Sequence, residues 1–99
     1  MIVKIEAPFK VSVSQENKIK TDLEKLVRYN NKMSKINVFF KIGDGNVSDS
    51  VVSEIEVHIP GPTVFASDSA KDFMDAFKGA LNKIDRSLKR DKEIRQAKR

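Results

Sequence analysis

Hydrophobic side chains recur at intervals of three and four residues between Ala70 and Leu88. Positions with this spacing share one face of an α-helix, so the pattern predicts a helix over residues 70–90 with a single apolar side. That side consists of Ala70, Phe73, Met74, Phe77, Ala80, Leu81, Ile84 and Leu88. Ser67 or Asp68 is expected to cap the start of the helix, because their side-chain oxygens can accept hydrogen bonds from free backbone N–H groups.

A second helix is predicted directly after Ser12. Ser12 and Gln15 have the spacing of a capping box, in which each side chain bonds to the backbone of the other residue. Ser14 is an alternative cap. The apolar residues expected on the buried face of this helix are Ile19, Leu23, Leu26 and Val27. We expect Asn30 and Asn31 to end the helix, since asparagine tolerates the left-handed conformation common at helix C-caps.

Alternation of apolar and polar residues predicts four β-strands. The four segments are 2–9, 36–42, 51–59 and 63–66. Pro8 should weaken the pairing at the end of the first strand, because proline has no N–H group to donate. A mobile loop is expected over residues 43–50, and Pro60, Gly61 and Pro62 are expected to form a tight turn.

The predicted order of elements, β-α-β-β-β-α, indicates an α+β fold. A right-handed crossover makes the first two strands parallel, and short connections make the later strands antiparallel, which gives a four-stranded mixed sheet in the order 1-2-3-4. Each helix has one apolar stripe, so both helices should pack on the same face of the sheet as a two-layer sandwich. We expect residues 1–90 to form one domain, and residues 91–99 to form a basic tail that is either a helical extension or disordered.

The positive charge of the chain is concentrated at its C-terminal end. Residues 83–99 contain eight basic and three acidic side chains, whereas the preceding residues contain 11 of each, so this end accounts for the whole net charge of +5. A concentrated basic surface is typical of proteins that bind nucleic acid or an anionic membrane. The alternative is a solvated helix end whose cations complement the helix dipole, but that effect reaches only the last turn.

Several classes of function are disfavoured by the residues present. The chain has no cysteine, which excludes disulfides and thiolate metal sites. His58 has no second strong metal ligand at a suitable spacing, and Gly43 and Gly45 lack the third glycine of a dinucleotide-binding loop. Glu54 and Glu56 are expected on a convex sheet surface rather than in a pocket. We therefore expect no enzyme activity, no cofactor, no metal and no small-molecule substrate.

The sequence also gives an expectation for localisation. No apolar run approaches the roughly 20 residues needed to cross a bilayer, and no signal-peptide pattern is present. We therefore expect a cytoplasmic protein without a membrane partner.

Basic residues of the two predicted helices form a candidate RNA-binding surface. If the helices lie side by side, these residues line a rim around and between them. Lysine and arginine there would contact phosphates, which position a protein without reading the base sequence, and folded RNA is recognised largely by its shape and backbone. The candidate binding residues are Lys25, Arg28, Lys78, Lys83, Arg86, Lys89, Arg90 and Lys92.

Two other interpretations remain open at this point. One is a generic module for structured RNA. The other is a protein–protein adaptor that uses the open face of the sheet, where Phe39 and Phe65 would lie among charged residues.

Four stretches of the sequence resemble the ribosome hibernation-promoting factor family, whose members are also called ribosome-associated inhibitors or sigma-54 modulation proteins. The stretches are residues 23–29, 59–61, 72–77 and 82–90. The last two resemble the family pattern in which D-M-Y-x-A-I is followed by K-L-E-R-Q-L and further basic residues. Residues 7–9 depart from the family, which usually has polar or basic residues there. Asp22 also departs, because the family commonly has a basic residue at that position.

The resemblance implies a bacterial protein that binds the small ribosomal subunit in the channel between head and body. There it would exclude messenger RNA and transfer RNA, inhibit translation and preserve idle ribosomes under stress or in stationary phase. By position, the basic residues that match the family, and so would contact rRNA, are Lys25, Arg28, Lys83, Arg86, Lys89 and Arg90. The chain resembles the short class, which lacks a dimerisation domain, so a monomer is expected. Whether it promotes or opposes ribosome dimerisation stays open.

Overall fold

The computed structural model describes the backbone of residues 1–43, 50–61 and 63–97, and the side chains of these ranges as far as Ile94. In chain order the elements are β1 (Ile2–Glu6), α1 (Val13–Glu24), the 3-10 helix η1 (Lys25–Tyr29), β2 (Lys35–Ile42), β3 (Val51–His58), β4 (Val64–Ala70) and α2 (Phe73–Ala97). The mobile loop predicted for 43–50 falls mostly outside the described residues, as does one residue of the predicted tight turn, Pro62.

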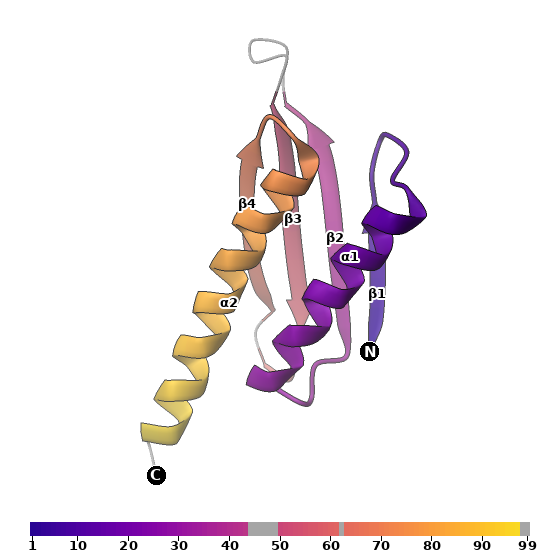
Figure 1. Ribbon diagram of the computed structural model, residues 1–99. Coiled ribbons are helices and arrows are strands. Elements are labelled where there is room, and N and C mark those ends of the chain that lie inside the picture. The colour runs from indigo at the N-terminus through magenta and orange to yellow at the C-terminus, as the bar shows by residue number, and fades with distance from the viewer. Residues whose placement is uncertain (44–49, 62, 98–99) are drawn as a thin grey trace.

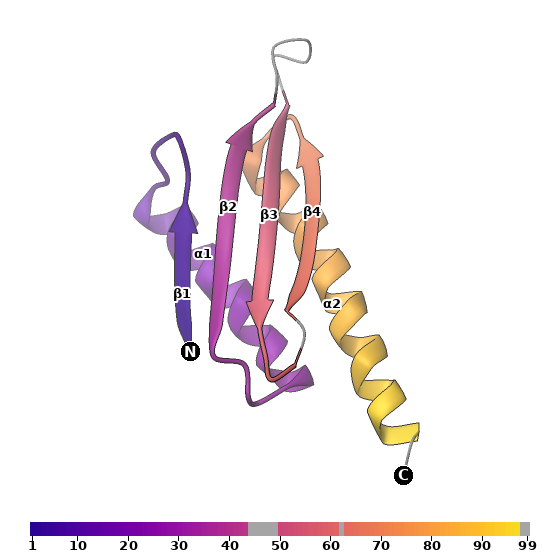
Figure 2. The same cartoon turned by 180° about the vertical axis from the view of Figure 1, so that it is seen from behind.

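The sheet has the predicted strand order, β1-β2-β3-β4. β1 is parallel to β2, and the other two pairs are antiparallel. Both helices cover one face of the sheet and leave the other face open, as the two opposite views show (Figure 1, Figure 2). The predicted two-layer α+β architecture is therefore confirmed.

The start of α1 follows from the predicted capping box. The Ser12 hydroxyl accepts a hydrogen bond from the Gln15 N–H at 3.1 Å, and the Gln15 side-chain oxygen accepts one from the Ser12 N–H at 3.0 Å. Ile19, Leu23 and Leu26 are buried as predicted. The cap therefore fixes where the helix begins, and the apolar spacing fixes which side it turns to the sheet.

The prediction for the end of this helix is wrong in two respects. Val27 is 36% exposed rather than buried. From Lys25 onward the chain is a 3-10 helix, whose three residues per turn align positions three apart, so Leu26 stays beside Leu23. Val27 instead lines an open hollow next to Met1 and Met33, which leaves it accessible to solvent. Asn30 is extended, at φ −161° and ψ 107°, and none of the described non-glycine residues has a positive φ. Asparagine therefore does not supply the predicted left-handed cap.

The boundary between the last strand and the last helix also differs from the prediction. β4 continues through Ala70 and α2 begins at Phe73, so Ser67 and Asp68 are strand residues rather than helix caps. Residues 67–70 pair with residues 51–54 of β3. The ladder hydrogen bonds of this long-range pairing outweigh the local preference of serine and aspartate for helix N-termini.

A single core lies between the sheet and the two helices. The buried apolar residues of this cluster are Ile19, Leu23, Leu26, Met33, Ile36, Val38, Phe40, Ile55, Val57, Phe77, Ala80, Ile84 and Leu88. Gly79 lets α2 approach β4 closely, because a Cβ atom there would collide with the carboxylate of Asp68. Close packing along β4 fixes the rotation of α2, and so fixes where its charged residues lie.

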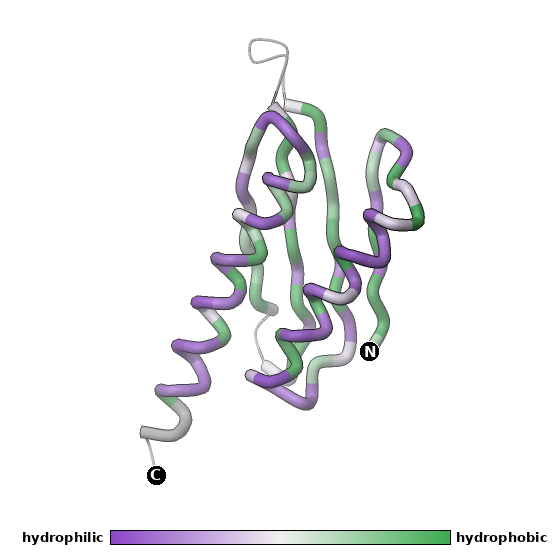
Figure 3. Tube along the Cα trace, viewed as in Figure 1, coloured by the Kyte–Doolittle hydropathy of each residue, from purple (hydrophilic) through white to green (hydrophobic). Residues whose placement is uncertain are grey.

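The end of α2 is different in character from its beginning. Its C-terminal half continues past the end of the sheet (Figure 1, Figure 2), and polar residues dominate this part (Figure 3). α2 extends to Ala97, beyond the boundary at residue 90. Division of the chain into a domain of residues 1–90 and a tail of residues 91–99 stays a prediction. Within the described ranges, no helix combines the length and the apolar character needed to span a membrane.

Candidate nucleic-acid interface

Basic side chains lie on two different sides of α2. Positions 83, 86 and 90 recur at intervals of three and four and share one side of the helix, and positions 78, 85, 89 and 92 share another. We call the first group, Lys83, Arg86 and Arg90, the outer stripe. The second side faces η1, because Asp85 and Lys92 both contact that element. The structure therefore divides the predicted basic rim into two surfaces.

The outer stripe lies beside β4. Lys83 Nζ donates a hydrogen bond to the Ser67 carbonyl oxygen at 2.9 Å and lies 3.8 Å from an Asp68 carboxylate oxygen. These contacts attach one end of the stripe to the sheet. A shallow hollow of about 250 Å³ is lined by the three basic residues together with Ser87. The hollow presents three cationic groups and a hydroxyl toward solvent, which is a set of donors suited to a phosphate.

Arg28 joins η1 to α2. Its guanidinium donates hydrogen bonds to Asp85 Oδ1 at 3.2 Å and to the Tyr29 hydroxyl at 2.9 Å, and it stacks over the Tyr29 ring at 4.8 Å from the centroid. The hydrogen bond to Tyr29, followed by that to Asp85, raises the pKa of Arg28 above its already high usual value. Lys92 Nζ donates to the Arg28 carbonyl oxygen at 3.2 Å. Arg28 is therefore a fixed positive charge between the two helices.

The remaining candidate residues are less constrained. Lys25 Nζ lies 3.7 Å from Asp22 Oδ1, which also receives a hydrogen bond from Lys18 at 3.0 Å. Asp22 thus lies between two lysines and reduces the local positive charge. This is the position at which the resemblance predicts a basic residue instead. Lys78 and Lys89 are exposed on α2, and no salt bridge to either was found in the described part of the chain.

The open face of the sheet holds a polar network that the sequence did not indicate. Asn37 is only 8% exposed, although its strand position places it on this face. Its Nδ2 donates to Glu56 Oε1 at 3.1 Å, and the same oxygen lies 2.7 Å from His58 Nε2. The hydrogen bond from His58, followed by that from Asn37, lowers the pKa of Glu56. The described residues contain no group of three or more side chains suited to a metal ion.

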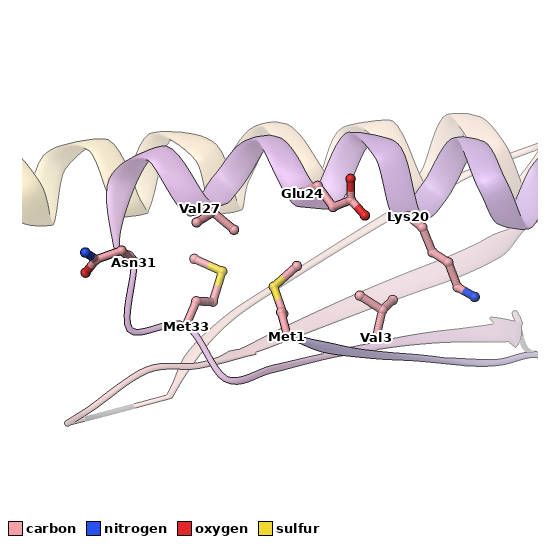
Figure 4. A pocket seen from close by; sticks show the side chains of 7 residues that line it. All are labelled: Met1, Val3, Lys20, Glu24, Val27, Asn31 and Met33. Atoms are coloured by element: carbon pink, nitrogen blue, oxygen red, sulfur yellow. The ribbon is translucent and has the colours of Figure 1, made fainter.

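A hollow of about 520 Å³ separates α1 and η1 from the start of β1. Met1 and Val3 from below, and Val27 from η1, point toward one another there (Figure 4). Lys20, Glu24 and Asn31 line its margin. None of the candidate binding residues lines this hollow, so it lies apart from the basic surfaces.

Residues 4–96 match the family described as Sigma 54 modulation protein / S30EA ribosomal protein. The chain belongs to this family. It is the hibernation-promoting factor family that the sequence motifs predict, so that prediction is confirmed. The match covers all eight candidate residues and every described strand and helix apart from the first two residues of β1 and the last of α2. No curated protein matches the chain.

Two solved structures share the fold of this S30EA-family protein. A ribosomal subunit interface protein from Coxiella burnetii superposes with a TM-score of 0.81 at 17% identity, covering 94% of this chain and 99% of that chain. The N-terminal domain of Protein Y from Thermus thermophilus has a TM-score of 0.73 at 19% identity, covering 89% of this chain and 93% of that chain. At 17% and 19% identity these structural similarities establish only the fold. The assignment of the chain to its family rests on the match over residues 4–96.

Membership of the S30EA family makes this chain one of a group of ribosome-associated proteins. Ribosome association accounts for the basic surface formed by the outer stripe and Arg28. Sequence reasoning found the basic residues by charge and spacing. It missed the pairing of Arg28 with Asp85 and the burial of Asn37, because both depend on which elements become neighbours in the fold.

Proposed function

We propose that this chain binds the small ribosomal subunit in the channel between head and body, where it excludes messenger RNA and transfer RNA and inhibits translation. Idle ribosomes would thereby be preserved under stress or in stationary phase. The observation that carries the proposal is the projecting half of α2, which has basic residues on two sides. A helix of this kind fits a channel whose walls on both sides are RNA.

Charge geometry supports backbone recognition of rRNA. The outer stripe is set at a fixed angle by the buried side of α2, and Arg28 is held in place by Asp85 and Tyr29. Charges held in this way lose less conformational entropy on binding than charges on a flexible segment. The two arginines of the stripe add planar groups that can each grip a phosphate with two hydrogen bonds.

The proposed rRNA contacts comprise the two basic surfaces together. The outer stripe would meet one wall of the channel, and the residues on the side facing η1 would meet the other. The residues assigned to rRNA binding are Lys25, Arg28, Lys78, Lys83, Arg86, Lys89, Arg90 and Lys92. We expect the chain to act as a monomer in the cytoplasm, where ribosomes translate.

Sedimentation tests this function directly. The chain is mixed with purified small subunits, with large subunits or with a long RNA duplex, and each mixture is centrifuged through a sucrose gradient. Hibernation requires co-sedimentation with the small subunit and inhibition of a cell-free translation reaction at similar concentrations. Equal binding to the duplex would indicate a generic RNA module, and binding to none of the three would favour the adaptor interpretation.

A further inference from the structure

β1 forms one edge of the sheet. Among the described strands it pairs only with β2, and both opposite views show it at the margin of the sheet (Figure 1, Figure 2). The Ile2 N–H donates to the Ser34 carbonyl oxygen at 3.1 Å, so the backbone groups of Ile2 face β2. Successive residues of a strand direct their backbone groups to opposite sides. The N–H and C=O groups of Val3 and Ile5 therefore point outward, away from β2.

These outward groups are open to pairing with another strand. In the part of the chain that the structure describes, no hydrogen bond from another segment to the outward groups of Val3 or Ile5 was found. The opposite edge of the sheet differs, because Lys83 of α2 donates to the Ser67 carbonyl oxygen of β4. An edge strand with unpaired backbone groups is a template for an added strand. We call the outward side of β1 the β1 edge.

Two hollows lie along the β1 edge, between β1 and α1. The larger, of about 520 Å³, is lined by Val3 from β1 and by Lys20 and Glu24 from α1 (Figure 4). The smaller, of about 240 Å³, is lined by Ile5, Ala7, Phe9, Val11 and Glu16. Val3 and Ile5 are consecutive on the side of β1 that packs against the core, roughly 7 Å apart. Side chains of an added strand recur at the same interval on that side, so two of them would lie over the two hollows.

The two hollows differ in the side chains that they suit. In the larger, Val27 and Met33 provide an apolar wall beside the Glu24 carboxylate, for which no salt bridge was found among the described residues. A lysine or arginine fits this hollow, because its stem packs on apolar surface while its cation pairs with the carboxylate. In the smaller, the Glu16 carboxylate is already paired with Lys20 at 3.0 Å. The other residues that line it are apolar, so it suits an aliphatic side chain.

We propose that an extended segment of a partner protein pairs with the β1 edge and places an aliphatic side chain in the smaller hollow and a lysine or arginine in the larger one. In such strand addition, backbone hydrogen bonds give affinity and pockets for alternate side chains give specificity. Antiparallel pairing is slightly more stable than parallel pairing, so the segment reads aliphatic-x-basic in chain order.

The proposed segment leaves the basic surfaces accessible. β1 and β4 are opposite edges of the sheet, and α2 packs along β4. A partner segment on the β1 edge can therefore be bound while the outer stripe contacts rRNA. This inference goes beyond the proposed function and does not depend on it.

Peptide titration of the isotope-labelled full chain tests the β1 edge without ribosomes. The probe is a capped heptapeptide of threonines with leucine at its third position and lysine at its fifth, and the readout is the chemical shift of each backbone amide. It should shift the amides of Val3, Ile5 and Glu24 and leave those of the outer stripe unchanged. A control peptide with leucine and lysine adjacent directs them to opposite faces and should cause no such shifts at the same concentration. Equal shifts with the two peptides, or none at Val3 and Ile5 with the probe, would overturn the proposal.

Backbone methylation of the probe tests the hydrogen bonds themselves. In antiparallel pairing the residues opposite Val3 and Ile5 direct their N–H groups toward β1, and these are the lysine and the leucine of the probe. N-methylation of both should abolish binding, whereas N-methylation of the second and fourth residues, whose N–H groups point away, should not. Loss of binding with both methylated peptides, or with neither, would rule out strand pairing.

Matched substitutions test the charge in the larger hollow. Glu24→Gln should weaken the probe about two- to fivefold, because an exposed ion pair is lost. Glu93→Gln removes the same charge from α2, away from both hollows, and should have no effect. Equal effects of the two variants would contradict a specific pairing with Glu24.

Two further measurements separate this inference from its alternatives. Absence of small-subunit binding would refute the proposed function, whereas the peptide titration would still decide the β1 edge. Sedimentation equilibrium of the full chain should show a monomer with and without the probe. A dimer that the probe dissociates would mean that a second copy of the chain occupies the β1 edge, and would overturn the choice of a partner segment.

Discussion

Arg28 of η1 donates a hydrogen bond to Asp85 of α2 at 3.2 Å, between residues 57 positions apart in the sequence. This contact and the bond from Lys92 to the Arg28 carbonyl oxygen tie the end of the first helical segment to the middle of the last. The same arginine is a proposed rRNA ligand. Asp85 therefore has two opposed effects, since it orients the guanidinium and also offsets its charge.

Asp85→Asn separates these effects. The free energy of unfolding should change little, because an exposed ion pair contributes little to stability. Affinity for the small subunit should rise, because a negative charge next to the proposed phosphate contacts is removed. Chemical denaturation and filter binding measure the two quantities. A fall in affinity would show that orientation of Arg28 matters more than its net charge.

Phe77→Ala tests the core face of α2. Phe77 is completely buried in the cluster between α2 and the sheet. Its truncation should destabilise the chain by about 3–5 kcal/mol, measured by thermal or denaturant unfolding. Phe65→Ala is the matched control, since it removes an identical side chain from an exposed position. Equal losses of stability in the two variants would contradict the assignment of the core.

Local patterns predicted the elements whose causes are local. The Ser12–Gln15 capping box and the alternation in β2 and β3 depend on residues a few positions apart, and both are confirmed. Ser67–Ala70 was predicted as a helix start because serine and aspartate favour caps, whereas pairing with β3 makes it a strand. That pairing is long-range and has no signature in residues 67–70 themselves.

The candidate site was predictable to the same limited extent. Helical spacing groups Lys83, Arg86 and Arg90 on one side of α2 without any structure. The contact of Arg28 with Asp85, by contrast, depends on how η1 lies against α2. Spacing within one element therefore predicts which basic residues share a side of a helix. The surfaces that these residues form depend on how the elements pack against one another.

The carboxylate of Glu56 should make stability depend on pH in the acid range. Hydrogen bonds from His58 and Asn37 lower its pKa in the folded chain below the ordinary value of 4.5. A lowered folded pKa means that the stabilisation is complete above the unfolded pKa and is lost as pH falls through the folded pKa. The stability difference between the wild type and Glu56→Gln should therefore shrink as pH is lowered below about 4.5. Denaturant unfolding at a series of pH values measures this difference; a constant difference would contradict the hydrogen-bonded arrangement.

Truncation after Arg90 should leave the fold intact. Leu88 is the last residue of the buried cluster, and Ile94 lies partly in solvent. The lost segment includes Lys92 and its bond to the Arg28 carbonyl oxygen, so a small decrease in melting temperature is expected. Circular dichroism during heating measures the transition. Loss of cooperative unfolding would show that residues 91–99 belong to the domain rather than to a tail.

Replacing Lys83, Arg86 and Arg90 together with glutamine tests whether the outer stripe carries the main rRNA contacts. With about five to eight phosphates contacted, the logarithm of affinity should fall with the logarithm of salt concentration with a slope of about −4 to −7. Three lost phosphate contacts should reduce the steepness of that slope by about two to three and abolish inhibition of cell-free translation. The melting temperature should change by only a few degrees, because surface substitutions usually cost less than about 0.5 kcal/mol each.

A matched control replaces Lys4, Lys20 and Lys41 in the same way. These lysines are likewise exposed or partly exposed and lie on β1, α1 and β2, where each forms a salt bridge with a glutamate. Removal of the same formal charge from these positions should leave the salt slope and the inhibition of translation unchanged. Equal damage by the control would mean that net charge alone drives binding. If both variants still inhibit translation, the basic residues of α2 are not needed for inhibition. The proposal that the chain binds in the channel of the small subunit would then have to be abandoned.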